Sequence, residues 1–354
     1  MVDTAFWKQR RVCLTGHTGF KGSWLSFWLK EMGAKVYGYA LEPETEPALF
    51  NQLNLASQIH HKVGDVRDAS IIKEWLNSIR PDVVYHLAAQ PLVRRSYREA
   101  HRTWETNVMG TVNLLEAVCQ MLSPCAVVVI TTDKVYENRE WDYAYREVDL
   151  LGGHDPYSSS KAATELAVAS WRSSYFMESK KIRIASARAG NVIGGGDWSE
   201  DRIIPDFVRS LSAGKSFEVR NPEAVRPWQH VLEPLSGYLK LAEKLLTEED
   251  PIWQSAFNFG PEAGDFRRVK DLVEEALQYW PGSWQDESDS EVPHEANFLT
   301  LTIEKARQKL GWHPRWDFHT AVQHTLEWYL KVQTNQASAE EICRQQIQLY
   351  EKCE

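Results

Sequence analysis

The stretch that decides the fold is RVCLTGHTGFKG, residues 11–22, near the start of the 354-residue chain. Its first four residues predict a short strand, and residues 22–32 predict a helix. Gly16, Gly19 and Gly22 occupy the turn between the two. Glycine allows close approach of the backbone to a pyrophosphate, and a helix N-terminus offers free N–H groups and a partial positive charge. In this strand–loop–helix context the glycine spacing predicts a dinucleotide-binding loop.

The alternation of strands and helices continues through the first half of the chain. Short apolar runs predict further strands at residues 35–40, 59–63, 82–87 and 126–130, and helical patterns predict helices at 69–80 and 102–121. The run at 126–130 lacks polar alternation, as expected for a strand covered on both faces. Repeated β-α-β units imply a parallel sheet with helices on both sides. We therefore predict an α/β fold with a Rossmann-like, doubly wound parallel sheet.

The regular pattern weakens after Gly190, where glycine, proline and tryptophan become frequent. We predict that residues 1–187 form the Rossmann domain, joined by later elements from about residues 226–260. Residues 188–354 then form mainly a smaller, mixed α/β C-terminal substrate lobe, ending in a helix at 338–354.

Composition and charge narrow the classes of function. The net charge is −9, whereas a nucleic-acid binder usually carries a basic excess, so we expect no nucleic-acid partner. No apolar run approaches the roughly 20 residues that span a bilayer, and the first residues lack the apolar core of a signal peptide. We therefore expect a cytoplasmic protein without a membrane partner. The five cysteines have neither zinc-ligand nor disulfide spacing, so we expect no metal.

Acidic residues after the second predicted strand bear on the choice of cofactor. In dinucleotide-binding units an acid about 20 residues after the glycine loop binds the ribose of NAD. Glu42, Glu44 and Glu46 follow the strand, and no arginine stands there to hold a 2′-phosphate. NAD is therefore favoured over NADP, although the pattern leaves open which glutamate binds the ribose. Asp65 and Val66, after the third predicted strand, suit contacts on the adenine side.

Tyr157 and Lys161 form a YxxxK pair, one turn apart on a helix whose start is indicated by Asp155 and Pro156. A nearby ammonium lowers the pKa of a phenol from about 10. Tyr157 can then accept a proton from a sugar hydroxyl while a hydride leaves the same carbon. Residues 131–134 follow the strand at 126–130 and reach the carboxyl edge of the sheet, where such folds bind ligands. There the Thr132 hydroxyl can hold the reacting hydroxyl.

Six motifs, in this order, resemble the extended short-chain dehydrogenase/reductase family. They are TGHTGFKG at 15–22, HLAAQ at 86–90, NVMGT at 107–111, TTDKVYEN at 131–138, YSSSK at 157–161 and RAGNVIGGGDW at 188–198. Within that family they are most similar to the CDP-glucose 4,6-dehydratases, over nearly the whole chain. The resemblance implies that NAD is bound by Gly16, His17, Thr18, Gly19, Phe20, Gly22, Asp65, Val66, Leu87, Ala88, Ala89 and Asn107, together with Tyr157 and Lys161.

The resemblance also implies a reaction. A hydro-lyase of this kind converts CDP-D-glucose into CDP-4-keto-6-deoxy-D-glucose, a precursor of deoxysugars and of lipopolysaccharide O-antigen. C4 is oxidised by NAD, water leaves across C5 and C6, and the hydride returns to C6. Tyr157 is then the C4 base, supported by Lys161 and Thr132, and Asp133 protonates the departing C6 hydroxyl.

Lys134 departs from the pattern of the related dTDP-glucose dehydratases, in which a glutamate follows the aspartate and is taken to remove the C5 proton. A charged lysine cannot accept a proton. Lys134 can act as the base only with a strongly lowered pKa, or else it stabilises the enolate that remains after proton loss. The identity of the C5 base therefore stays open.

Substrate binding and assembly are further expectations from the resemblance. Asn191 and Arg226 are similar to family residues that bind the diphosphate, and Arg188 and Arg202 are further candidates for charge-assisted bonds to it. In the resembling family two long helices, which correspond to residues 102–121 and 155–176 here, pair between subunits, and this implies a homodimer or a homotetramer. The alternatives are another nucleotide-sugar dehydratase, a C4 epimerase, which needs no acid such as Asp133, and an NAD-sensing regulator, which could dispense with the tyrosine and lysine.

Overall fold

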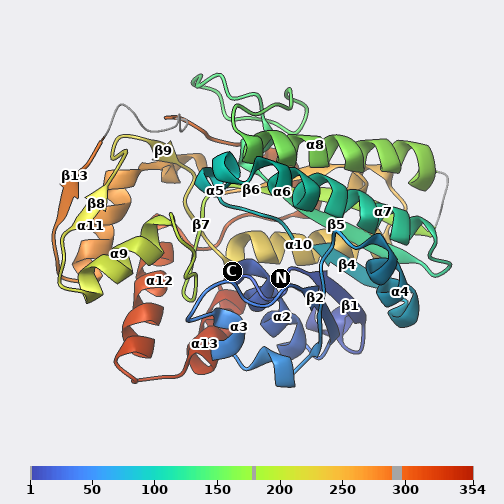
Figure 1. Ribbon diagram of the computed structural model, residues 1–354, viewed down its shortest axis with the longest axis horizontal. Helices are drawn as coiled ribbons and strands as arrows, with labels where there is room; N and C mark the ends of the chain where they lie inside the picture. The colour runs from blue at the N-terminus through green and yellow to red at the C-terminus, as the bar shows by residue number, and fades with distance from the viewer. Residues whose placement is uncertain (1, 178–180, 289–296, 354) are drawn as a thin grey trace.

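The computed structural model describes residues 2–177, 181–288 and 297–353. Its centre is a seven-stranded sheet in the order β11-β6-β5-β4-β1-β2-β3, in which every neighbouring pair is parallel (Figure 1). The strands are β1 Arg11–Thr15, β2 Lys35–Ala40, β3 His60–Val63, β4 Val83–His86, β5 Cys125–Thr132, β6 Ile182–Ala189 and β11 Ala256–Phe259. The predicted strands are confirmed to within one or two residues at their ends.

Helices cover both sides of this sheet (Figure 1). One side carries α4 Ala69–Ile79, α5 Val93–Arg98, α6 Ala100–Trp104, α7 Gly110–Cys119 and α8 Pro156–Trp171, and the other carries α2 Phe20–Glu31 and α10 Leu232–Thr247. The strands divide their side chains between two apolar cores. In β1, Val12 and Leu14 belong to the core with Trp24 of α2, whereas Cys13 belongs to the core with Leu114 of α7. The predicted doubly wound sheet is therefore confirmed.

The predicted helix at residues 102–121 differs in detail. It begins earlier, as α6, and a π-helical turn, η2 Glu105–Met109, separates α6 from α7. The π turn directs Asn107 into the interior, where it is 1% exposed. At the N-terminus the residues before β1 form a short helix, α1 Thr4–Trp7.

The remaining elements lie mostly after β6. They are β7 Val192–Ile193, α9 Ile203–Ser212, β8 Phe217–Val219, β9 Val225–Arg226, β10 Gln229–His230, β12 Arg267–Arg268, α11 Val269–Tyr279, β13 Trp284–Asp286, α12 Phe318–Gln333 and α13 Ala339–Lys352. Short turns complete the chain: α3 Leu49–Gln52, η1 Leu55–Ser57, η3 Asp133–Val135, η4 Arg172–Phe176, η5 Pro251–Trp253, η6 Ala263–Asp265 and η7 Ala306–Leu310. The terminal helix is confirmed as α13, while residue 354 lies outside the described residues.

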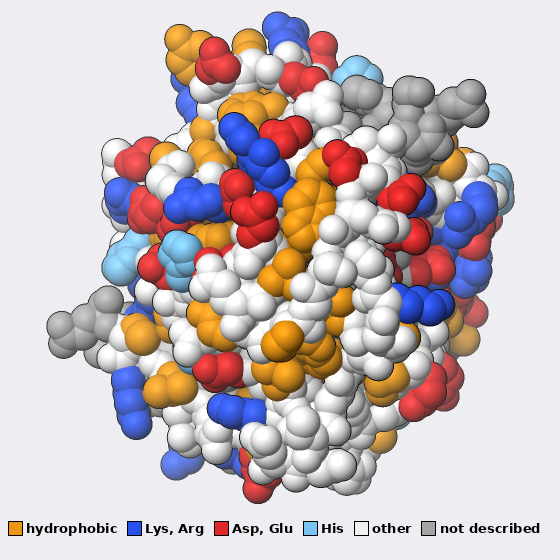
Figure 2. All heavy atoms as spheres, turned by 90° about the vertical axis from the view of Figure 1, so that its left-hand side faces the viewer, with side chains coloured by type: hydrophobic (Ala, Val, Ile, Leu, Met, Phe, Trp, Pro, Cys, Tyr) orange, Lys and Arg blue, Asp and Glu red, His pale blue; other side chains and the backbone are white. Residues whose placement is uncertain are grey.

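The segment after β6 forms a second lobe and also returns to the sheet. β11 pairs with β6, and α10 packs against β5 and β6. The lobe itself contains α9, α11, α12 and three two-stranded sheets. Figure 2 shows the face of the molecule that carries this lobe, where acidic and basic side chains are interspersed. Among the residues that the structure describes, no helix is long and apolar enough to cross a membrane.

Candidate active site

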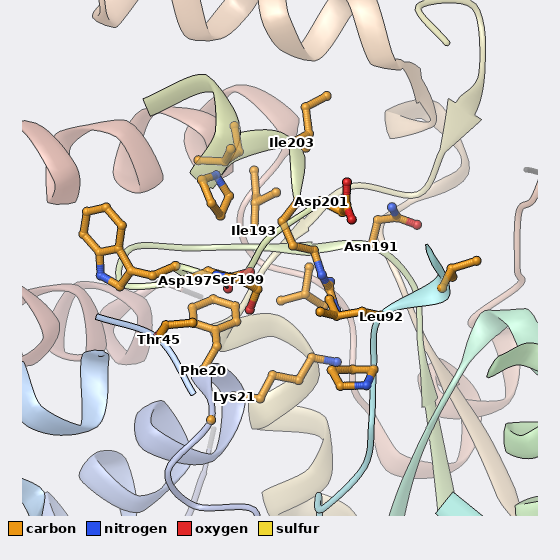
Figure 3. Close-up of a pocket in the computed structure, with 18 of the residues that line it drawn as sticks. Phe20, Lys21, Thr45, Leu92, Asn191, Ile193, Asp197, Ser199, Asp201 and Ile203 are labelled. Atoms are coloured by element: carbon orange, nitrogen blue, oxygen red, sulfur yellow. Dashed lines mark hydrogen bonds between the residues drawn. The ribbon is translucent and has the colours of Figure 1, made fainter. Parts of the chain in front are cut away.

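A cavity of about 910 Å³ lies between the glycine loop and the second lobe. Residues after the carboxyl ends of β1, β2, β4, β5 and β6 line it, which is where ligands bind in open parallel sheets. In Figure 3 the Phe20 and Lys21 side chains enter it from α2, and Asn191, Asp197 and Asp201 enter from the second lobe. Its volume is near the upper end of the range for small-molecule sites.

The three glycines of the loop differ in why their positions do or do not require glycine. Gly16 has a φ of +74°, and a Cβ there would lie 2.7 Å from the backbone nitrogen of Ala88. A Cβ on Gly22 would lie 2.2 Å from the carbonyl oxygen of Gly16. A Cβ on Gly19 would meet only ordinary contact, 3.5 Å from the same oxygen. Gly19 is also the N-cap of α2 and gives it no side-chain cap, so the first-turn N–H groups are available to an anion.

The structure brings most of the predicted cofactor residues to the cavity. Those that line it are Gly16, Thr18, Gly19, Phe20, Gly22, Asp65, Val66, Leu87, Ala88 and Ala89, with Tyr157 and Lys161. Of the three glutamates after β2, Glu42 and Glu44 line the cavity. Glu44 is engaged with Arg95 at 2.8 Å, and the Asp65 carboxylate with Arg67 at 2.6 Å.

Two of the residues expected to bind NAD, His17 and Asn107, do not line the cavity, contrary to the expectation that they contact the cofactor. His17 is fully buried behind the loop, and its Nε2 is 2.7 Å from Nδ1 of His61. Asn107 is held within the protein: its amide donates to the carbonyl of Gln90 at 3.1 Å and to Ser160 at 2.8 Å. Asn107 therefore fixes the loop after β4 against α8. The π turn that turns it inward has no signal in the apolar pattern of the sequence.

The end of β5 supplies three of the predicted catalytic residues. Thr132, Asp133 and Lys134 all line the cavity. The Thr132 hydroxyl donates to Oδ1 of Asp133 at 2.9 Å, while Oδ2 of Asp133 is buried and has no hydrogen-bond partner among the described residues. Gly190 packs closely here, because a Cβ on it would lie 2.9 Å from that Oδ2. The Asp133 carboxylate is thus held firmly, with one oxygen unused.

Tyr157 and Lys161 both lie on α8, which Asp155 caps by accepting from the backbone N–H of Tyr157 and of Ser158. Burial raises the pKa of Tyr157 to about 12, and the Arg202 guanidinium and hydrogen bonding to Thr132 act in the opposite direction. The sequence predicted that Lys161 supplies the charge that favours the phenolate, but the cation with the largest effect is Arg202. The buried Lys161 ammonium donates to the carbonyl of Ile130 at 3.0 Å, and burial lowers its pKa to about 8.

Three of the four predicted substrate residues line the cavity: Asn191, Arg202 and Arg226. Arg188 does not, which corrects the expectation that it helps to bind the substrate. It is 3% exposed and donates to both carboxylate oxygens of Glu165 at 3.0 Å and to the Tyr136 hydroxyl at 3.0 Å. Burial alone would raise the pKa of Glu165, but Arg188 and two hydroxyl donors hold it below its ordinary value. Arg188 therefore has a structural role.

Replacing Arg188 by methionine is expected to lower the free energy of unfolding by about 3–5 kcal/mol, because it leaves the Glu165 carboxylate buried without its cation. Urea unfolding measures the change. Removing both charges, as Arg188→Met with Glu165→Met, should cost less than the sum of the single changes. Arg146→Met is the control: the exposed Arg146 pairs with Asp149, and its replacement should leave the midpoint nearly unchanged. Additive costs for the two buried residues would contradict the coupling.

Lys21 is a cavity residue that the sequence analysis did not single out. The sequence does contain an indication of this role, because a lysine in the first turn of a helix after a glycine loop lies where an anionic ligand binds. The glycine spacing predicts backbone contacts to a ligand, and the Lys21 side chain also enters the cavity (Figure 3). Among the described residues, no group of His, Cys, Asp and Glu side chains is arranged to hold a metal ion.

Comparisons with known proteins agree with this geometry. Residues 13–325 match the family described as GDP-mannose 4,6 dehydratase. The chain is 47% identical over 335 residues to the CDP-glucose 4,6-dehydratase of Salmonella typhimurium, covering 93% of each, and 24% identical to the human GDP-mannose 4,6 dehydratase, covering 92% of each.

Solved structures share the fold. The UDP-glucose 4-epimerase of Thermotoga maritima superposes with a TM-score of 0.78 at 21% identity, covering 91% of this chain and 99% of the other. The dTDP-glucose 4,6-dehydratase of Streptomyces venezuelae superposes with a TM-score of 0.75 at 24% identity, covering 92% of this chain and 98% of the other. The match over most of the chain and the 47% identical relative together show that the chain belongs to the family of nucleotide-sugar 4,6-dehydratases described as GDP-mannose 4,6 dehydratase.

Proposed function

We propose that the protein is a hydro-lyase that converts CDP-D-glucose into CDP-4-keto-6-deoxy-D-glucose with NAD as its cofactor. The observation that carries the proposal is that Asp133, an acid suited to C6, and Tyr157, a base suited to C4, line one cavity. The 47% identity to a CDP-glucose 4,6-dehydratase over 93% of both chains supports CDP-glucose as the substrate.

The residues around the glycine loop fit NAD. The uncapped first turn of α2 and the side-chain-free Gly19 suit its diphosphate, and Glu42 and Glu44 suit ribose hydroxyls rather than a 2′-phosphate. When bound, NAD would accept a hydride from C4 of the sugar and return it to C6. In the domain division that we propose, residues 1–187 build this half of the site and belong to a domain that later elements from about residues 226–260 complete. Residues 188–354 mainly build the half that holds the sugar nucleotide.

Tyr157 would take the proton of the C4 hydroxyl, which Thr132 orients. Both side chains are 7% exposed, so water competes little for this position. Because burial raises the pKa of Tyr157 to about 12, the phenolate needs a stabilising charge, and Arg202 supplies the largest one. Lys161 would then act mainly on the cofactor side, from its anchor on the carbonyl of Ile130.

Asp133 would donate a proton to the departing C6 hydroxyl through Oδ2, the oxygen that is buried without a hydrogen-bond partner among the described residues. Thr132 holds the other oxygen and Gly190 packs against the carboxylate, so the acid is oriented before substrate binds. Lys134 would act at C5, as the base or as a cation beside the enolate. Asn191, Arg202 and Arg226 would bind the sugar nucleotide.

A C4 epimerase is the second candidate, because an epimerase shares the fold with a TM-score of 0.78. Epimerisation requires only the base and the hydride acceptor at C4. It gives no reason for a buried, fixed carboxylic acid next to the tyrosine, which favours dehydration. Another nucleotide-sugar dehydratase, acting on a dTDP- or GDP-linked sugar, would use the same catalytic groups.

The proposal is tested by incubating the protein and NAD separately with CDP-glucose, dTDP-glucose and GDP-mannose. We expect CDP-glucose to lose one water and to give a 4-keto-6-deoxy product, identified by mass and by the carbonyl resonance. A product of unchanged mass with inverted C4 would instead identify an epimerase. Dehydration of dTDP-glucose or GDP-mannose instead would change the proposed nucleotide of the substrate, and the proposed type of reaction would stand.

We propose a homodimer or a homotetramer. Trp104, Met109, Leu166 and Tyr175 are large apolar side chains on α6, η2, α8 and η4, and each is between 43% and 61% exposed. These helices lie together on one side of the sheet (Figure 1). An isologous pairing of such a helical face is the commonest way to bury it.

Light scattering at micromolar concentration is therefore expected to give about two or four times the 40.8 kDa chain mass. Leu166→Glu, in the middle of α8, should shift the mass toward the single chain, because it buries a charge in the interface. The matched control is Leu122→Glu, at a side chain that is 85% exposed outside these helices. A single-chain mass for the unmodified protein would contradict the assembly.

The setting of the reaction is also a proposal. A nucleotide sugar is made inside the cell, so we propose a cytoplasmic enzyme. A 4-keto-6-deoxy sugar nucleotide is an activated precursor, and we propose that it leads to deoxysugars such as those of lipopolysaccharide O-antigen. Detection of the product in extracts of the source cells tests this setting.

A further inference from the structure

Lys21 has no role in the reaction as described so far. It occupies the first turn of α2, and its side chain lines the cavity. Figure 3 shows it extending from α2 into the cavity, with Asp201 and Ile203, the neighbours of Arg202 in the chain, on the other side. Within the described parts of the chain, neither the Lys21 ammonium nor the Arg202 guanidinium has an ion pair or a hydrogen bond to another side chain.

Four charged side chains from four different segments act on Lys21. Arg202, the N-cap of α9, and Lys161 of α8 repel its charge, and Asp133 of η3 and Asp197 of the loop after β7 attract it. Burial lowers the pKa of Lys21 to about 7, and Arg202 is the strongest of the charges that act on it. The two carboxylates do not offset this, and Oδ2 of Asp133 has no hydrogen-bond partner among the described residues.

Lys21 and Arg202 line the same cavity and repel each other, and among the described residues neither cation is ion-paired with a carboxylate. An anion between them turns this repulsion into two charge-assisted hydrogen bonds. The uncapped first-turn N–H groups of α2 add a partial positive charge on the same side. The cavity of about 910 Å³ has room for a group with several anionic oxygens.

We propose that Lys21 and Arg202 clamp the diphosphate of a bound nucleotide between the Rossmann domain and the second lobe. This assignment rests on the proposed function, because that function brings two diphosphates, one in NAD and one in CDP-glucose, into this cavity. Lys21 would thereby couple the two lobes in the occupied state. Either diphosphate has the chemistry that the clamp requires, and the experiment distinguishes them.

Binding through Lys21 links affinity to pH. Only the protonated ammonium binds the diphosphate, so bound anion raises the pKa of Lys21 above about 7. Affinity is then greatest below that pH, and it declines as the pH rises through 7 toward the higher pKa of the complex. Arginine at this position would stay charged throughout and abolish the decline.

Titration calorimetry on the purified protein tests the clamp without turnover. ADP-ribose is the probe for the cofactor diphosphate and CDP for the substrate diphosphate, while AMP and CMP are probes with a single phosphate. The variants are Lys21→Met, which removes the charge at similar length, and Lys21→Arg, which retains it. Lys73→Met is the matched control, because Lys73 is exposed on α4 outside the cavity.

We expect Lys21→Met to lower the affinity for one diphosphate probe about tenfold or more at pH 6.5, as for a lost charge-assisted hydrogen bond. The corresponding monophosphate should change by less than about threefold, Lys21→Arg should restore binding, and Lys73→Met should have no effect. The probe whose affinity falls, ADP-ribose or CDP, identifies the diphosphate that the clamp holds.

Unchanged binding of both diphosphates by Lys21→Met would overturn the clamp, and so would an equal loss for diphosphates and monophosphates. A variant that loses its circular dichroism spectrum is replaced by Lys21→Gln for the same measurement. The proposed function fails separately, through the absence of a dehydrated product from the unmodified protein, since the binding measurement needs no catalysis.

Discussion

Replacing Tyr157 by phenylalanine is expected to lower turnover of CDP-glucose by about 10²–10⁴-fold, the usual contribution of a positioned acid–base group. The change removes one hydroxyl from a residue of α8 that is 7% exposed, and it retains the buried ring. NAD affinity should therefore stay within about threefold of that of the unmodified protein. The measurement is single-turnover formation of NADH, because oxidation of C4 is the step that needs the phenolate.

Tyr143→Phe provides the matched control, since Tyr143 is 75% exposed and does not line the cavity. It should leave turnover unchanged. Retention of more than a few per cent of turnover by Tyr157→Phe, with NAD still bound, would show that another group removes the C4 proton. Lys161 would be the first to examine, because burial lowers its pKa to about 8.

The parallel sheet and the place of the site were predictable because they depend on local patterns. The apolar strand at 126–130 indicates a strand that is covered on both faces, and the glycines at 16, 19 and 22 indicate the cofactor loop. Two of these glycines have local reasons: Gly16 has a positive φ, and a Cβ on Gly22 would contact the backbone of the same loop. A single sequence contains all of this information.

The side chains that were misplaced depend on contacts distant in the chain. Arg188 was expected to help bind the substrate diphosphate, but Glu165 on α8 holds it in the interior. His17 lies within the loop motif, yet it turns toward His61 of β3. The direction of each side chain is set by a partner that is 23 or 44 positions away in the chain. Such a pairing cannot be predicted from local sequence patterns.

The charge that favours the Tyr157 phenolate illustrates the same limit. Spacing on one helix placed Lys161 near Tyr157, and both do lie on α8. The ammonium is nevertheless engaged by the carbonyl of Ile130, and Arg202 of the second lobe has the larger effect on the phenol. Periodicity predicts neighbours within an element, whereas the electrostatics of the cavity depend on how the two lobes meet.

Replacing Asp133 by asparagine is expected to separate the two halves of the reaction. The amide keeps an oxygen that can accept from Thr132, as Oδ1 of Asp133 does at 2.9 Å, so the fold and C4 oxidation should persist. The variant cannot donate the proton that the C6 hydroxyl needs to leave. NADH should therefore form in a single turnover and persist, while steady-state turnover falls by about 10²-fold or more.

Asp142→Asn, at an exposed position outside the cavity, is the control for this experiment and should turn over normally. The persistent NADH itself demonstrates that the Asp133→Asn protein is folded and binds both ligands. Normal turnover by Asp133→Asn would place the C6 acid elsewhere, and failure to form any NADH would show that Asp133 is required before elimination.

Lys134→Ala completes the assignment at C5. If Lys134 removes the C5 proton, exchange of that proton with heavy water should slow by about the same factor as turnover. If Lys134 stabilises the enolate only by its charge, Lys134→Arg should retain much of the exchange, because arginine keeps the charge but does not act as a base at neutral pH. Exchange that is unchanged in Lys134→Ala, together with reduced turnover, would limit Lys134 to positioning. The base would then have to be another group that lines the cavity, and Asp133, in its protonated form, would act beside it as the acid.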